Sequence, residues 1–227
     1  MAEPEAPPAA RPSQREQAAT EARTRILKAA AECIVRDGLA QVRTASIART
    51  AGVSAGLLHY HFDTKELLFG EVLKYSHGVS MELNRRAMAG AGEGPAERLS
   101  SFLDRCLPSD ERLAHEWLLW QELALLCIRD PHLATVGAEL YETLYATVAD
   151  IVAAGVASGT FVTALEPRFV AKAAVALTDG LGGRVLAKDP NLGLEEARAT
   201  IATTIGILVG HDGPLPPPAH LDQAIGP

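Results

Sequence analysis

The chain has 227 residues, of which 48% are hydrophobic and 22% charged, a composition typical of a soluble globular protein with one or two domains. Aromatic residues make up only 5%, which disfavours an aromatic-rich β-sandwich or barrel. The formal net charge of −7, taken over the whole chain, argues against a nucleic-acid-binding protein.

The charge is unevenly distributed along the chain. Residues 11–62 hold eight basic and four acidic side chains, a net charge of +4, so the rest of the chain carries −11. Such an asymmetry indicates a basic module joined to an acidic body. The excess is modest, and from charge alone chance explains it as well as DNA binding does.

The three cysteines, Cys33, Cys106 and Cys127, are far apart in apolar stretches, and no Cys/His spacing resembles a zinc site. We expect free thiols in a reducing cytoplasm, with no metal or other cofactor. The first residues lack the features of a signal peptide, and we find no uncharged apolar run of about 18 residues that would span a membrane.

In chain order, residues 1–20 are rich in Pro, Ala, Glu and Gln and predict a disordered arm. Apolar residues then recur at three- and four-residue spacing and predict a helix over 22–37. Short helices are expected over 44–51 and 55–61, and a fourth helix begins after a cap at Asp63 or Thr64.

The second half of the chain reads as five further helices, with no alternating pattern typical of β-strands. Their expected ranges are 95–107, 110–129, 131–157, 167–188 and 193–210. The helix over 110–129 is apolar nearly all round, which is typical of a helix in the middle of a bundle. The Pro-rich residues 212–227 predict a second tail, because proline does not continue a helix.

Residues 43–62 have the layout of a helix-turn-helix, two short helices joined by a tight turn at Gly52. In this motif the second helix lies in the DNA major groove, where small or polar residues let the backbone approach the base edges. Ser54, Ala55 and Gly56 meet that requirement. From the next turn Leu57, His59 and Tyr60 project outward, while Val53, Leu58 and Phe62 face the core.

The stretch from residue 25 to residue 68 resembles the N-terminal domain of the TetR/AcrR family of transcriptional regulators. It carries the joint pattern IA–x–x–AGVS–x–G–x–L–x–x–x–F–x–x–K–x–x–L, and ALTDGL at 176–181 resembles a penultimate-helix segment of one subgroup. The resemblance implies an all-α fold of about nine helices. An N-terminal three-helix DNA-binding domain (21–75) would precede a C-terminal helical ligand-binding and dimerisation domain (76–211).

The resemblance further implies a homodimeric repressor that binds a palindromic operator and is released by a small-molecule effector. Lys65, at the start of the fourth helix, would meet a phosphate. Arg43 departs from the Ser or Thr common at the second helix's cap, so Thr44 is expected to take over the capping. The expected DNA-binding residues are Arg43, Thr44, Ser54, Ala55, Gly56, Leu57, His59, Tyr60 and Lys65.

The middle helices would enclose the effector, and their aromatic residues are the candidates to line its pocket. The expected ligand-binding residues are Phe102, Cys106, Trp117, Trp120, Gln121, Tyr141 and Tyr145. Two Trp on one helix are also explained as core residues. Asp179 lies in an apolar helix and needs a partner: a group across the dimer interface, a ligand, or water at the helix surface.

The last two helices would form the dimer interface, where small residues let helices approach closely. The expected interface residues are Phe169, Ala173, Leu177, Leu181, Ile201, Ile205 and Leu208. Burial of the same residues within one chain is the alternative.

No arrangement of residues points to catalysis. We find no nucleophile motif, P-loop, dinucleotide fingerprint or HExxH zinc motif, so we expect no enzyme activity. There are two alternatives to a repressor. One is an activator of the same fold, and the other is a helical ligand-binding protein without operator function.

Overall fold

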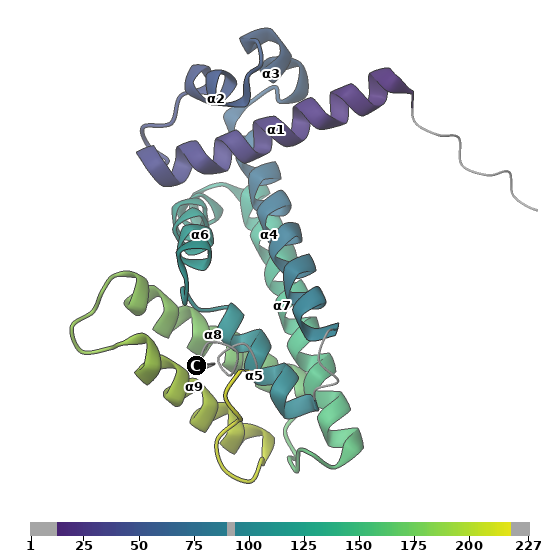
Figure 1. The fold of residues 1–227 in the computed structure, drawn as a ribbon, viewed down its shortest axis with the longest axis vertical. Helices are drawn as coiled ribbons and strands as arrows, with labels where there is room; N and C mark the ends of the chain where they lie inside the picture. The colour runs from purple at the N-terminus through teal and green to yellow at the C-terminus, as the bar shows by residue number, and fades with distance from the viewer. Residues whose placement is uncertain (1–12, 90–93, 219–227) are drawn as a thin grey trace, which may run out of the picture. The chain divides into compact units, whose positions relative to one another are not determined.

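In the computed structural model, residues 13–89 and 94–218 are described, and every regular element within them is an α-helix (Figure 1). This confirms the all-α prediction. The nine helices of these ranges are α1 (Gln14–Asp37), α2 (Thr44–Ala51), α3 (Ala55–His61), α4 (Lys65–Ala89), α5 (Pro95–Arg105), α6 (Glu111–Arg129), α7 (Pro131–Ser158), α8 (Pro167–Leu186) and α9 (Leu194–Val209). The chain divides into two compact units after Val72, inside α4 and three residues before the expected boundary.

The first helix begins earlier than the sequence composition suggested. Ser13 and Glu16 form a capping box: the Glu16 carboxylate accepts from the Ser13 backbone N–H at 2.7 Å, and Ser13 Oγ accepts from the Glu16 N–H at 3.3 Å. The prediction of a disordered arm over 1–20 is therefore wrong for residues 13–20. A capped run of good helix formers needs no large apolar residues to extend a helix whose later turns are buried. Residues 1–12 lie outside the described residues.

The first unit packs α1 against α2 and α3. Ile26, Cys33 and Ile34 of α1 are buried in this unit. So are Ile47 of α2, Leu58 of α3 and the ring of Phe62. Arg23 forms an ion pair with Glu71, and its guanidinium lies 5.4 Å from the centre of the Phe62 ring. These contacts hold the start of α4 to α1 beneath the two short helices.

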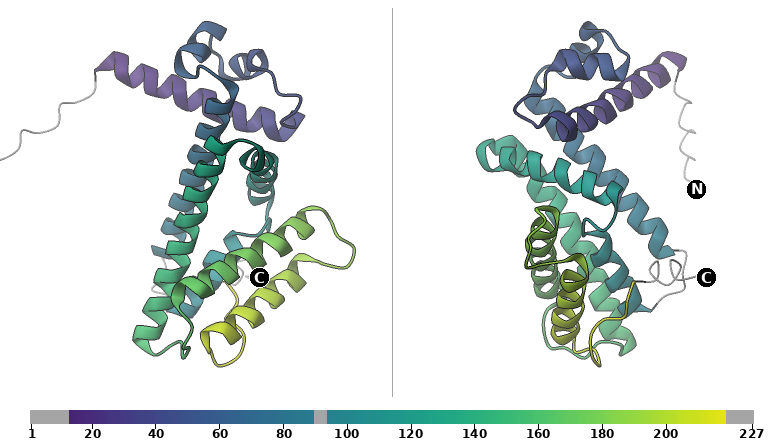
Figure 2. Two further views of the ribbon diagram at one scale, coloured as in Figure 1. Left: turned by 180° about the vertical axis from the view of Figure 1, so that it is seen from behind. Right: turned by 60° about the vertical axis from the view of Figure 1, so that its left-hand side comes forward.

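The second unit is built around α7, which packs against α5, α6 and α8, while α8 also packs against α9. Figure 2 shows α8 and α9 side by side, in green and yellow. Their shared core includes Phe102, Phe161, Val170 and Ile205. Gly155 permits a close approach, because a Cβ there would lie within 2.8 Å of Cγ of the Phe161 ring.

The C-terminal segment also departs from the prediction. Leu215 is buried and its N–H donates to the carbonyl of Ala202 at 3.0 Å, while Ser100 Oγ donates to the carbonyl of Pro216 at 2.6 Å. The expected tail is therefore wrong for residues 212–218, which join α5 to α9. Proline ends a helix, but its ring and carbonyl still pack and accept hydrogen bonds. Residues 219–227 lie outside the described residues.

The position expected for α6 in the middle of a bundle is also wrong. Leu123 is fully buried, but Leu125 and Ile128 are 58% and 81% exposed. Within the described residues α6 packs mainly on α7 and α8, and the side that holds Leu125 and Ile128 is open to solvent. Apolar residues on all sides of a helix thus do not by themselves show how many neighbours it has.

One helix, α7, is long and apolar enough to cross a membrane by length and composition, with a mean hydropathy of 1.2 over 18 residues. This segment differs from the expectation that no stretch of the chain would span a membrane. The helix carries Glu139, Glu142 and Asp150, and three neighbouring helices pack against it. Of the 18-residue window, 28% is buried within the described structure.

Candidate functional site

The helix α3 presents a small, polar outer surface. It starts because Gly52 adopts a left-handed conformation (φ +64°) and because Ser54 Oγ accepts from the Leu57 N–H at 3.1 Å. Leu58 and Phe62 point into the core, as predicted, so the opposite side of α3 faces solvent. That side holds Ser54, Ala55, Gly56, His59 and Tyr60, whereas Leu57 is half-buried.

Two residues on this surface are largely open to solvent. Tyr60 is 77% exposed. A Cβ built on Gly56 would meet only Ser54 Oγ, at 3.9 Å, so the unit's own packing does not require glycine there. A large exposed aromatic ring beside a glycine that faces open space suits contact with an external molecule.

The residues that begin α2 and α4 differ in how they cap their helices. Arg43, exposed, occupies the N-cap position of α2, and no side chain caps that helix; the expectation that Thr44 caps it is wrong, because Thr44 already lies within the helix. At α4 the cap is Thr64, whose Oγ1 accepts from the Leu67 N–H at 3.2 Å. Lys65 lies in the first turn of α4, with Nζ 5.6 Å from the centre of the Phe69 ring.

A pocket in the second unit lies among α4, α6, α7 and α8, with a cavity of about 130 Å³. Of the predicted ligand-binding residues, Cys106, Trp117, Trp120 and Tyr141 line it. Tyr145 stacks against Tyr141, with ring centres 5.9 Å apart.

Two predicted pocket residues lie elsewhere. Phe102 belongs to the closed core, with no exposed surface, and Gln121 is exposed on α6. The spacing of aromatic and polar residues identified the right helices, but it did not distinguish the pocket-facing side from the core side.

Asp179 is the acidic group of this pocket. Its carboxylate accepts from the Tyr141 hydroxyl at 2.8 Å, and the Tyr141 ring meets Trp120 edge-on, with ring centres 5.4 Å apart. Burial raises the pKa of Asp179, and the Tyr141 hydrogen bond lowers it in part. Burial, together with the nearby carboxylate, also raises the pKa of Tyr141. The partner that the sequence required for Asp179 is therefore a tyrosine at the edge of a cavity.

Six polar residues of the pocket were not predicted from the sequence: Ser76, His77, Ser80, Asn84, Arg105 and Glu116. Arg105 Nε donates to Asn84 Oδ1 at 2.5 Å, and burial lowers the pKa of His77, whose Nε2 is buried without a hydrogen-bond partner in the described structure. The positions of His77, Ser80 and Asn84, three and four residues apart, form a polar stripe on α4. The spacing of these residues can be recognised in the sequence. The sequence does not show which helices face them.

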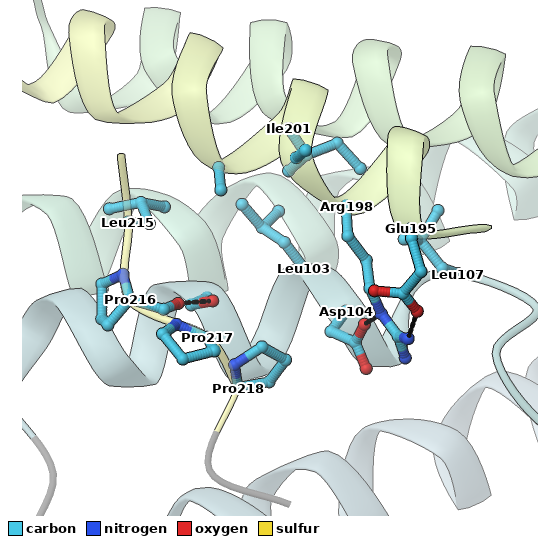
Figure 3. Close-up of a pocket in the computed structure, with 13 residues that line it drawn as sticks. Leu103, Asp104, Leu107, Glu195, Arg198, Ile201, Leu215, Pro216, Pro217 and Pro218 are labelled. Carbon is cyan, nitrogen blue, oxygen red and sulfur yellow. Dashed lines mark hydrogen bonds and ion pairs between the residues drawn. The ribbon is translucent and has the colours of Figure 1, made fainter. Parts of the chain in front are cut away.

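A second cavity, of about 280 Å³, lies between α5, α9 and residues 215–218 (Figure 3). Its charged groups neutralise one another: Arg198 donates to Asp104 at 2.6 Å and to Glu195 at 2.5 Å. The side chains of Asp104 and Arg198 are 3% and 15% exposed, so this ion pair is largely withdrawn from water. Although larger, this cavity offers a ligand fewer free charged groups than the pocket at Asp179.

The residues expected at a dimer interface separate into two groups. Ile201 and Ile205 are buried in the chain's own core, so they do not lie on a surface that a second chain could contact. Phe169 is 57% exposed, and Ala173, Leu177, Leu181 and Leu208 are half-buried. Ala176 and Gly180 continue the exposed side of α8, and Ile207, 73% exposed, lies on that of α9.

Comparison with known proteins gives two family matches. Residues 95–210 match the family described as "BetI-type transcriptional repressor, C-terminal", and residues 26–72 match "Bacterial regulatory proteins, tetR family". The chain is also 34% identical over 91 residues to the HTH-type transcriptional regulator BetI of Agrobacterium fabrum (strain C58 / ATCC 33970). That alignment covers 39% of this chain and 43% of the relative, less than half of either.

Among solved structures with the same fold, two align with this chain over nearly their whole length. A protein from Rhodococcus sp., described as a TetR-family transcriptional regulator, is 28% identical, with a TM-score of 0.74 over 84% of this chain and 99% of that one. A transcriptional regulator from Saccharomonospora viridis, solved in complex with choline, is 26% identical, with a TM-score of 0.73 over 86% of this chain and 98% of that one.

Proposed function

The chain belongs to the TetR family of transcriptional regulators, and we propose that it is a ligand-responsive repressor released from operator DNA by a small cationic effector. Membership of this family also confirms the expectation that the chain is not an enzyme. Regulators of this family bind DNA and small molecules, typically as dimers. The operator, the effector, the dimer contacts and a cytoplasmic location without membrane attachment are proposed for this chain.

The observation that carries DNA reading is the open surface of α3. Ser54, Ala55 and Gly56 leave room for the backbone to approach base edges, and Tyr60 is free to lie against the sugar-phosphate. Arg43, Thr44, Leu57 and His59 flank this surface, and Lys65 at the start of α4 takes a phosphate. Footprinting of the promoter next to the protein's own gene tests this. A protected palindrome whose binding weakens steeply with salt is expected, and protection nowhere in the genome would contradict it.

For the effector, the pocket at Asp179 carries the argument. A buried carboxylate beside the rings of Trp120 and Tyr141 favours an organic cation, because carboxylate charge and aromatic faces both attract it. Cys106 and Trp117 complete the wall, and Tyr145 supports Tyr141 from behind. The choline in the Saccharomonospora relative agrees with this chemistry. Choline should release the operator from the wild-type protein and not from Asp179→Asn, and equal release from both would contradict the assignment.

For the dimer, the exposed side of α8 carries the argument. Phe169, Ala173, Ala176 and Gly180 lie along one side of the helix, where small residues allow another helix to approach. Ala176→Arg adds bulk and charge at an exposed position and is expected to give a folded monomer by light scattering. The control, Ala154→Arg, changes an exposed alanine of α7 and should remain dimeric. A dimeric Ala176→Arg protein would refute this interface.

A further inference from the structure

The pocket at Asp179 also contains a positive charge. Arg105 lies on its wall, and none of the ion pairs among the described residues involves Arg105 or Asp179. The third charged group, Glu116, is occupied, since it pairs with Arg112 and accepts from Ser80 Oγ at 3.1 Å. The pocket therefore has one carboxylate and one guanidinium that are each held by a neutral partner, Tyr141 and Asn84.

The two charged groups line one small cavity, of about 130 Å³. Burial, together with the charge of Asp179, raises the pKa of the Cys106 thiol to about 12, and the Arg105 charge opposes this shift. Cys106 follows Arg105 in the chain, and its carbonyl accepts from Trp117 Nε1 at 3.0 Å. Because Arg105 and Asp179 line the same small cavity as Cys106, a single molecule bound in it can contact both charged groups.

A cation alone would satisfy only half of this pocket. It would pair with Asp179 and leave the Arg105 guanidinium, which in the described structure is hydrogen-bonded to Asn84, without an anionic partner. The orphaned Nε2 of His77 and the hydroxyl of Ser80 line the same pocket as Arg105 and add further polar atoms. A carboxylate is the group that matches a guanidinium in geometry and charge.

We propose that the effector of this protein is a short zwitterion, with its ammonium group at Asp179 and the rings of Trp120 and Tyr141 and its carboxylate at Arg105. This rests on the proposed function of the pocket as the effector site, and it differs from a simple cation such as choline by requiring an anionic group. The cavity of about 130 Å³ limits the molecule to a small one, since pockets for drug-sized ligands are about 300–1,000 Å³.

The test is calorimetric titration of the full chain, without DNA, with three probes of similar size. Trimethylglycine has both charges, choline has only the positive one, and 3,3-dimethylbutanoate has only the negative one. The wild-type protein should bind trimethylglycine at least about tenfold more tightly than either other probe, the usual effect of one charged hydrogen bond. Arg105→Gln should lose about tenfold for trimethylglycine and keep its affinity for choline, whereas Asp179→Asn should weaken both.

Arg129→Gln, an exposed arginine at the end of α6, is the matched control and should change none of these affinities. The inference is overturned if choline binds the wild-type protein as tightly as trimethylglycine, or if Arg105→Gln weakens both probes equally. Failure of the folded wild-type protein to bind any probe also overturns it. Zwitterion selectivity in a protein that protects no operator would instead refute only the proposed function.

Discussion

Because the space around Gly56 is open, adding one methyl group there should change protein stability and DNA affinity in opposite directions. In Gly56→Ala the new Cβ meets nothing nearer than Ser54 Oγ, at 3.9 Å, so the folded unit accepts it without rearrangement. In the DNA complex the same methyl group would lie between α3 and the groove. The substitution should therefore stabilise the free protein and weaken the complex.

Both magnitudes follow from the position in the structure. Gly56 is the second residue of α3, and replacing glycine by alanine in a helix stabilises by about 0.5–1 kcal/mol, up to a fivefold gain in the folding equilibrium. Overpacking a close contact costs about 1–3 kcal/mol, so each DNA-reading unit should lose about 5- to 150-fold in affinity. Because the two effects have opposite signs, a general loss of folding cannot imitate the result.

Urea denaturation measures the first effect, and fluorescence anisotropy with labelled operator DNA at two salt concentrations measures the second. Gly78→Ala on α4 is the matched control, since a Cβ there also meets nothing within 4 Å and the residue is far along the chain from α3. It should stabilise similarly and leave operator affinity unchanged. Undiminished operator binding by Gly56→Ala would show that α3 does not approach the DNA through this residue.

Three further predictions concern the second unit. Asp179→Asn should raise the melting temperature at pH 7, because burial raises the pKa of this carboxyl above its ordinary value near 3.8 and its ionised form therefore costs stability at neutral pH; an unchanged or lower melting temperature would contradict this. Asp104→Ala should cost about 3–5 kcal/mol in urea denaturation because it leaves Arg198 buried without its main partner, whereas the exposed Glu195→Ala should cost under about 1 kcal/mol; similar small effects would show that the ion pair is not withdrawn from water. Burial lowers the pKa of His77, so as the pH falls the unfolded chain takes up this proton near pH 6.5, before the folded chain does. The free energy of unfolding should therefore be highest above that pH and decrease as the pH drops below it. His77→Gln should flatten the dependence of melting temperature on pH between 7.5 and 5.5, and an equally steep dependence would refute the role of this residue.

The sequence predicted the first unit more completely than the second because its signals are local. Gly52, Ser54 and the inward positions of Leu58 and Phe62 act within a few residues of one another, and spacing alone locates them. The capping box at Ser13 is equally local, although the composition of residues 1–20 is also that of a disordered segment. Asp179 was recognisable because an acidic residue in an apolar helix needs a partner.

The second unit depends on which helix covers which side of its neighbour. Periodicity places Ile201 and Ile205 on an apolar stripe of α9, but it does not show whether the stripe faces the chain's own core or a second chain. Arg105 and His77 enter the pocket from α5 and α4, which are separated in sequence from Asp179 by more than 70 residues. No local spacing connects them, so only the packed structure brings the two charges into one cavity.

The contact between Gly182 and Trp117 has a consequence for how effector choice can diverge among relatives. Trp117 donates Nε1–H to the Cys106 carbonyl, and its ring lies so close to Gly182 that a Cβ there would come within 2.8 Å of Cη2. Any side chain at position 182 therefore requires a smaller residue at position 117, and that exchange would open the pocket wall beside Cys106. In aligned relatives, a larger residue at position 182 should occur together with a smaller residue at position 117. By this exchange a lineage could acquire a bulkier effector while its DNA-reading helix and its pocket carboxylate stayed the same.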